Sequence, residues 1–343
     1  MRYLLAPFAI LFYFIQGLRG WLYSKSILKI KKVPKPVISI GNITTGGTGK
    51  TPWVQKVSNI LSSKNKKVCI LSRGYSGDFD GVLAVTKTMD PRKCGDEPLW
   101  LVNNTEADVY VGRSRTQAAG KALSEVNPDI FLLDDGFQHR KIHRDLDIVL
   151  IDVSAPESHY SLLPMGRLRE PFSSLKRASM VVLNKCNFVD AEIVASYVET
   201  IKRKAPQSNI FYADFSFSKW VPIIDELSQD FTNDKVSMTC GLGNPKSFVK
   251  TLNQLNIQPV KEFIFPDHYY WNPKDVEIMS YGMKRIGSKN LVMTEKDAVK
   301  LNRYKKHFFE MGIQLWVCKM QVQLRNRQED FEKIILELGE NKE

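Results

Sequence analysis

Short apolar runs alternate with helical patterns over the first two thirds of the chain. Each run is continuously apolar and is bounded by polar or glycine-containing turns. Such runs are typical of parallel strands that are covered on both faces. The pattern predicts strands at 37–40, 68–72, 82–86, 109–111, 130–135, 148–152 and 180–184, and helices at 51–64 and 114–125. We therefore expect residues 36–208 to form a doubly wound α/β domain, with its chemistry at the carboxyl ends of the strands.

The pattern changes near residue 209. Two stretches, 210–217 and 314–323, alternate between apolar and polar positions, which predicts a pair of connector strands. Residues 209–343 are expected to hold this connector and a smaller second α/β domain. Its predicted strands lie near 236–240, 260–265 and 291–294, and its predicted helices near 245–255 and 273–286. A last helix, at about 327–338, could pack on either domain.

Residues 1–35 form a separate amino-terminal segment. Residues 3–15 are uncharged and almost wholly apolar, but the run is short for a spanning helix, which needs ~20 apolar residues. The first 35 residues carry seven basic side chains and no acidic one, and aromatic residues flank the apolar run. This combination predicts a helix that lies in a membrane interface. The alternative is a helix buried against the protein's own core.

A glycine-rich loop follows the first predicted strand, where residues 41–52 read G-N-I-T-T-G-G-T-G-K-T-P. Glycines allow backbone N–H groups to surround a phosphate, and a helix starting near Thr51 adds its positive end. Lys50 would reach the β- and γ-phosphates, and the Thr51 hydroxyl would hold Mg²⁺. Thr44 stands where the usual pattern has glycine, yet strand, loop and helix agree with a P-loop. The residues expected to bind a nucleoside triphosphate are Thr45, Gly46, Gly47, Thr48, Gly49, Lys50, Thr51 and Pro52.

Composition narrows the class of partner. The formal net charge is +12, which favours an anionic partner such as nucleic acid, an anionic membrane or a phosphorylated substrate. General solubility is the plain alternative. The five cysteines are scattered without a C-x-x-C spacing, which argues against a zinc site or a disulfide framework.

Two acidic pairs are candidates for chemistry. Asp134 and Asp135 end a predicted buried strand, where a P-loop enzyme places the carboxylate that organises Mg²⁺. The loop after them is rich in histidine and arginine, and Arg140 could clamp a phosphate, although a solvated basic loop would look the same. Asp96 and Glu97 precede a helix with Pro98 in its first turn. Asp96 could accept a proton from a hydroxyl nucleophile, or it could simply cap the helix.

Further polar groups lie in the second predicted domain. His268 stands in the run F-P-D-H-Y-Y, flanked by aspartate and tyrosine. Lys296 and Lys300, in T-E-K-D-A-V-K-L, could be plain surface charges. The run 184–187, N-K-C-N, faintly echoes the guanine-reading N-K-x-D, but its fourth residue is Asn187.

Seven motifs in order resemble one family. They are G-N-I-T-T-G-G-T-G-K-T-P, L-S-R-G-Y, G-D-E-P, L-D-D-G-F-Q-H-R-K-I-H-R-D-L-D-I, L-P-M-G-R-L-R-E-P, F-P-D-H-Y and T-E-K-D-A-V-K-L. Together they resemble tetraacyldisaccharide 4′-kinases, the lipid A 4′-kinases of Gram-negative bacteria. Arg167 departs from the family, which usually has proline there, and this puts the shape of that loop in doubt.

The resemblance implies a reaction and a set of roles. It implies ATP- and Mg²⁺-dependent phosphorylation of the 4′-hydroxyl of a tetraacyl glucosamine disaccharide 1-phosphate, by a monomeric peripheral protein on the cytoplasmic face of the inner membrane. No nucleic-acid partner is expected. Asp96 would be the general base with His268 as its partner, alongside Lys50 in catalysis. Metal ligands would be Thr51, Glu97, Asp134 and Asp135, and the residues near the lipid's sugar or phosphate would be Arg73, Tyr75, His139, Arg140 and Arg169.

Two other classes of protein remain as alternatives. A membrane-associated regulatory ATPase of the partitioning type usually has lysine where this chain has Thr45, and it has no need for His268. A GTP-dependent binding module or metal chaperone is disfavoured by Asn187 and by the absence of a Cys/His metal cluster in the sequence.

Overall fold

The computed structural model describes residues 5–224 and 230–340. In this part of the chain twelve strands form a single sheet, in the order β10-β9-β11-β12-β8-β7-β6-β1-β5-β2-β4-β3. Adjacent strands are parallel except for two antiparallel pairs, β3 with β4 and β8 with β12. The strands are β1 (Val37–Asn42), β2 (Val68–Ser72), β3 (Val82–Val85), β4 (Asp108–Gly112), β5 (Ile130–Asp134), β6 (Leu146–Asp152), β7 (Met180–Asn184), β8 (Asn209–Pro222), β9 (Val236–Gly241), β10 (Lys261–Phe265), β11 (Asn290–Thr294) and β12 (Gln314–Leu324).

Helices cover this sheet and confirm the α/β fold class. They are α1 (Ala6–Ser24), α2 (Lys50–Ser62), α3 (Pro91–Cys94), α4 (Asp96–Asn104), α5 (Arg115–Glu125), α6 (Ala191–Lys204), α7 (Pro245–Gln254), α8 (Pro273–Ile286), α9 (Glu295–Leu301), α10 (Lys305–Glu310) and α11 (Gln328–Glu340). In β7, Met180 and Val182 join one apolar cluster while Val181 and Leu183 join another. Because successive side chains of a strand point to opposite faces, both faces of the sheet are buried there. This explains the continuous apolar runs in the sequence.

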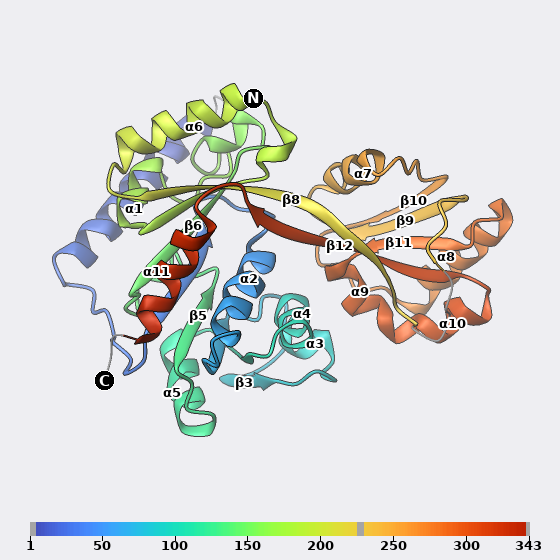
Figure 1. Ribbon diagram of the computed structural model, residues 1–343, viewed down its shortest axis with the longest axis horizontal. Coiled ribbons are helices and arrows are strands. Elements are labelled where there is room, and N and C mark those ends of the chain that lie inside the picture. The colour runs from blue at the N-terminus through green and yellow to red at the C-terminus, as the bar shows by residue number, and fades with distance from the viewer. Residues whose placement is uncertain (1–4, 225–229, 341–343) are drawn as a thin grey trace.

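The connector is the pair of long strands β8 and β12. Figure 1 shows it as a twisted ribbon between the two halves of the molecule: the first half holds β1–β7, and the second half holds β9–β11. One end of β8 pairs with β7 of the first half, while β12 pairs with β11 of the second half. The sheet therefore continues through the connector without interruption. The division of the chain into 1–35, 36–208 and 209–343 stays a prediction.

Helix α11 packs on the first half, beside α2 (Figure 1). Its Phe331 is fully buried, with ring centroids 5.6 Å from Trp53 of α2 and 5.2 Å from Phe211 of β8. Edge-to-face rings at such distances stabilise a packed core. The sequence left open on which domain the last helix packs, and the structure places it on the P-loop domain.

Helix α1 exposes much of its apolar surface. Phe8, Phe14 and Leu18 are each more than half exposed, whereas Ala9 and Tyr23 are buried. Among the described residues no helix is both long enough and apolar enough to cross a membrane. Because the apolar side chains Phe8, Phe14 and Leu18 are exposed, the alternative of a helix buried against the protein's own core is wrong.

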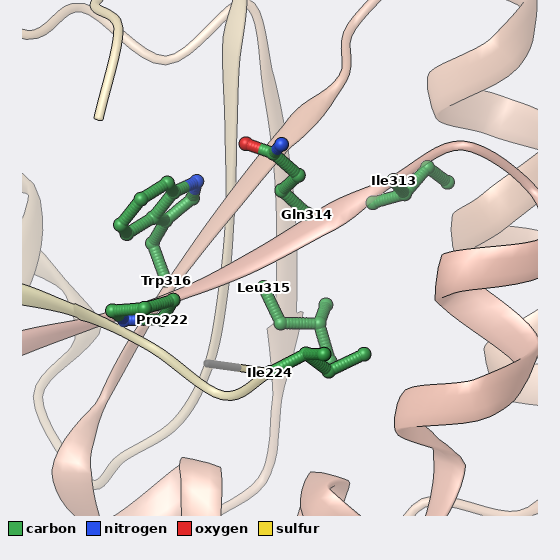
Figure 2. A pocket seen from close by; sticks show the side chains of 6 residues that line it. All are labelled: Pro222, Ile224, Ile313, Gln314, Leu315 and Trp316. Atoms are coloured by element: carbon green, nitrogen blue, oxygen red, sulfur yellow. The ribbon is translucent and has the colours of Figure 1, made fainter. Parts of the chain in front are cut away.

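A small cavity of about 10 Å³ lies where β8 ends and β12 begins (Figure 2). It is lined by Pro222, Ile224, Ile313, Gln314, Leu315 and Trp316. Its size suits at most about one water molecule, so it cannot hold a nucleotide or a sugar.

Candidate active site

The glycine-rich loop lies between β1 and α2, at the centre of the sheet. Gly46 and Gly49 have φ angles of 101° and 83°, in the region that favours glycine. A Cβ at Gly49 would come within 2.9 Å of the Asn184 amide. That amide donates a 2.9 Å hydrogen bond to the Thr48 carbonyl, and the Asn42 amide donates a 2.8 Å bond to the Thr48 hydroxyl. Hydrogen bonds from Asn42 and Asn184 to Thr48 thus hold the loop before any ligand binds.

Lys50, in the first turn of α2, faces the carboxyl end of β5. Its ammonium lies 3.6 Å from Asp135, which also accepts two hydrogen bonds from Arg169 at 2.8 and 2.9 Å. Burial alone would raise the pKa of Asp135, but Lys50 and Arg169 outweigh it and hold that pKa below its usual range. Arg169, which the sequence placed near the lipid, therefore lies beside the P-loop.

Asp134 has a different environment from its neighbour. It accepts a 2.9 Å hydrogen bond from Ser72, and it is 3% exposed. Burial, together with the charges of Glu97 and Asp135, raises the pKa of Asp134 to about 6. A divalent cation would offset this concentration of negative charge. The described residues nevertheless contain no group of three or more His, Cys, Asp or Glu side chains arranged to hold a metal alone.

Asp96 and His268 meet although they are 172 residues apart. Asp96 is the first residue of α4, and its side chain is almost fully buried. It follows Gly95, whose φ of 93° requires glycine. His268 lies in the loop after β10, and its Nδ1 is 3.2 Å from both carboxylate oxygens. Gly95, not Asp96, is the N-cap residue of α4, so the reading of Asp96 as a simple cap is wrong.

Two lysines of α9 complete this cluster. The Lys296 ammonium lies 3.2 Å from His268 Nε2 and 3.4 Å from Glu97, and Lys300 lies 3.6 Å from Asp96. Burial would raise the pKa of Asp96, but the His268 hydrogen bond and the Lys296 charge lower it to about 2. Lys300 is 2% exposed, so reading it as a plain surface charge is wrong.

The remaining predicted substrate residues fall into two places. Tyr75 is exposed, with its ring centroid 5.1 Å from that of His268, and Arg73 is exposed close by in sequence. Arg140 instead lies 4.6 Å over the Tyr23 ring of α1. His139 precedes it, and burial together with Arg115 lowers the pKa of His139 to about 4.

A groove of about 360 Å³ runs between α1 and the segment 170–177. Arg19, Arg140 and Arg177 line it together with Glu170. Its charged lining residues are thus mainly basic, and it lies beside the exposed apolar helix α1.

Several residues support the P-loop in a role that the sequence did not indicate, including members of the run 184–187. Asn42 and Asn184 brace the P-loop, and Lys185 pairs with Asp152 while its ammonium lies 3.4 Å from the Gly47 carbonyl. Asn187 exchanges two hydrogen bonds with the Phe215 backbone, so it fixes β8 to this loop. Their position in the sequence could have identified Asn42 and Asn184 as candidates, because both end apolar runs that are strands of the same sheet.

The mostly parallel sheet, the glycine loop with Lys50 and the buried carboxylates are those of a P-loop phosphotransferase, and a second α/β unit packs beside these candidate residues. A sequence profile of the family "Tetraacyldisaccharide-1-P 4'-kinase" matches residues 1–340. The chain belongs to this family.

Relatives cover nearly the whole chain. It is 31% identical to the tetraacyldisaccharide 4′-kinase of Bdellovibrio bacteriovorus, over 98% of this chain and 99% of that one. It is 36% identical to the Aquifex aeolicus tetraacyldisaccharide 4′-kinase, over 90% and 92% of the two chains. The solved structure of LpxK from Aquifex aeolicus in complex with ATP matches with a TM-score of 0.75 and 32% identity, over 98% of this chain and 99% of that chain.

Proposed function

We infer that this protein is an ATP-dependent kinase that phosphorylates the 4′-hydroxyl of tetraacyldisaccharide 1-phosphate, a step in lipid A biosynthesis. The family membership supports the reaction. The observation that carries the mechanism is the meeting of Asp96 from the P-loop half with His268 from the second half. A phosphoryl transferase needs a nucleotide cradle and a group that receives the acceptor's proton, and the glycine loop and Asp96 are the candidates for these two roles.

We propose that residues 45–52 bind the ATP phosphates. The left-handed glycines let loop N–H groups face a phosphate, and Lys50 at the start of α2 adds a positive charge. When ATP binds, the Lys50 ammonium would leave Asp135 and contact a phosphate oxygen instead. It would then stabilise the charge on the transferring phosphoryl group. Arg169 would then keep Asp135 compensated, because it holds that carboxylate with two hydrogen bonds.

We propose Thr51, Glu97, Asp134 and Asp135 as the residues that hold Mg²⁺. The donor set fits, since hydroxyl and carboxylate oxygens suit this ion, and it usually takes one or two carboxylates with phosphates completing the shell. Burial, together with the charges of Glu97 and Asp135, raises the pKa of Asp134, and this supports a cation beside that carboxylate. Bound there, Mg²⁺ would neutralise charge on the β- and γ-phosphates.

We propose that Asp96 receives the proton of the 4′-hydroxyl. With its pKa near 2, Asp96 is ionised but weakly basic. It would therefore orient the hydroxyl by accepting its hydrogen bond and would take the proton late, as the O–P bond forms. His268 would fix the carboxylate by donating to it.

We propose that Arg73, Tyr75, His139 and Arg140 contact the glycolipid headgroup. Tyr75 lies against His268, where the reacting sugar would sit, and Arg140 lines the basic groove beside α1. Substrate phosphate and sugar hydroxyls suit these donors. Such an acceptor also accounts for the positive net charge without a nucleic-acid partner.

We propose that α1 lies in the cytoplasmic surface of the inner membrane and that the protein works there as a monomer. The exposed apolar side chains of α1 and the basic residues of the first 35 positions support this placement. Phe14→Glu should lower the fraction that sediments with anionic vesicles. Ile278→Glu is a matched control, because Ile278 on α8 is also 65% exposed. Equal loss in both variants would contradict the role of α1.

The reaction is tested by following the γ-phosphate of labelled ATP with the lipid acceptor in detergent. We expect label in the lipid. Label released only as free phosphate, at a rate unaffected by the lipid, would instead support the regulatory-ATPase alternative.

A further inference from the structure

Both ring nitrogens of His268 have polar partners in the site. Nδ1 lies 3.2 Å from each oxygen of Asp96, and Nε2 lies 3.2 Å from the ammonium of Lys296. Lys296 comes from α9, and its ammonium is also 3.4 Å from Glu97, 3.8 Å from Asp96 and 3.9 Å from Asp267. Three carboxylates within 4 Å keep this partly buried ammonium charged.

The direction of these hydrogen bonds is fixed by the partners. A lysine ammonium can only donate, so the nitrogen that faces it must offer a lone pair. The ammonium at 3.2 Å therefore favours an unprotonated Nε2 with the ring proton on Nδ1, and it lies closer to Nε2 than the exposed Asp267 carboxylate, which is 3.9 Å away and would favour a proton on Nε2. An ionised carboxylate can only accept, and Nδ1–H donates to Asp96. The opposite tautomer, or a doubly protonated ring, would place an N–H bond against the ammonium.

We propose that Lys296 is a positioning residue that holds His268 in its Nδ1-protonated tautomer and so leaves Asp96 as the only proton acceptor of the pair. Nε2 is occupied by Lys296 and cannot take the proton of the 4′-hydroxyl. The tautomer itself does not depend on the reaction, whereas its kinetic consequence rests on the proposed function. His268 and Lys296 both belong to the second half, whereas Asp96 belongs to the first, so docking of the two halves adds the Asp96 contact to the ring that Lys296 already holds.

Ring-nitrogen NMR tests the tautomer directly. The full-length protein is labelled with ¹⁵N-histidine, and the signal of His268, one of five histidines, is assigned by its loss in His268→Gln. We expect the wild-type ring to carry its proton on Nδ1. Lys296→Met should let Nε2 take up a proton while Nδ1–H still donates to Asp96, giving a doubly protonated ring, whereas Lys296→Arg, which keeps a cationic donor, should preserve the wild-type pattern.

The control is Lys284→Met, which removes an exposed lysine from the last turn of α8. It should leave the His268 signals unchanged. Unchanged signals of the other histidines in Lys296→Met would show that this variant is folded. A wild-type ring protonated on Nε2, or identical His268 signals in wild type and Lys296→Met, would overturn the proposal.

Kinetics test the consequence separately. Lys296→Met should lower kcat by roughly 10- to 100-fold, the range for residues that orient a functional group through a hydrogen bond, with little change in KM. Lys296→Arg should recover most of the rate. A changed protonation of the ring with wild-type kcat would refute the assignment of Asp96 as sole acceptor. Absence of lipid phosphorylation by the wild-type protein would refute the proposed function instead, and the NMR result would stand.

Discussion

Asp96 should stabilise the fold as well as serve the reaction, and Asp96→Asn measures this. The pKa of Asp96 falls from its ordinary value of 3.8 to about 2, because its bond to His268 and the Lys296 and Lys300 charges outweigh the effect of burial. A tenfold change in proton affinity corresponds to about 1.4 kcal/mol, so the depression is worth about 2 kcal/mol of unfolding free energy. A carboxylate with a lowered pKa stabilises the fold above 3.8, and this contribution is lost as the pH falls toward 2.

The assay is urea-induced unfolding of wild type and Asp96→Asn, followed by tryptophan fluorescence between pH 7 and pH 3. We expect the variant to be less stable by about 2 kcal/mol from pH 7 to pH 5, with the difference shrinking below about pH 4. A difference that stays constant down to pH 3 would mean that the ionised carboxylate is not what stabilises this contact.

Three further predictions concern other parts of the molecule. Phe331→Ala should destabilise the first half by about 3–5 kcal/mol in urea unfolding, because it empties a fully buried site between Trp53 and Phe211; a loss below 1 kcal/mol would contradict that packing. The folded protein binds a proton at His139 only near pH 4, whereas the unfolded chain does so near 6.5. The free energy of unfolding should therefore decrease as the pH is lowered from 6.5 to 4, and it should decrease less in His139→Gln; parallel profiles of unfolding free energy against pH would refute this. Lys50→Met should lower kcat/KM at least ~100-fold with an unchanged circular dichroism spectrum, and a near-normal rate would remove Lys50 from the mechanism.

The sheet could be predicted because its strands are buried on both faces. Strands such as β5 and β7 are apolar at nearly every position, and such runs are visible in a sequence without any contact information. The short helices α3, α9 and α10 were not predicted, since four to seven residues are too few to show a helical period. The position of α11 was left open because an apolar helix face shows which side of the helix is buried but not against which element it packs.

The candidate site was only partly visible in the sequence. The P-loop and the acids that end β5 are local signals, so the residues of both could be named. The environment of Lys300 could not, because Asp297 lies three residues before it on α9 but Asp96 reaches it only by the docking of α9 on α4. The same docking brings Lys296 to Asp96 and Glu97. Contacts between the two halves are thus what sequence patterns could not supply.

The central claim is that this site transfers the γ-phosphate of ATP to the 4′-hydroxyl of the lipid. The most direct measurement is phosphorus–proton correlation NMR of tetraacyldisaccharide 1-phosphate after incubation with ATP, Mg²⁺ and the protein, with Asp96→Ala alongside. We predict a new phosphomonoester coupled to the 4′ proton, formed by the wild type and lost in the variant. A product phosphorylated elsewhere, or only inorganic phosphate, would contradict the proposed reaction, and an equal yield from Asp96→Ala would contradict the role of Asp96.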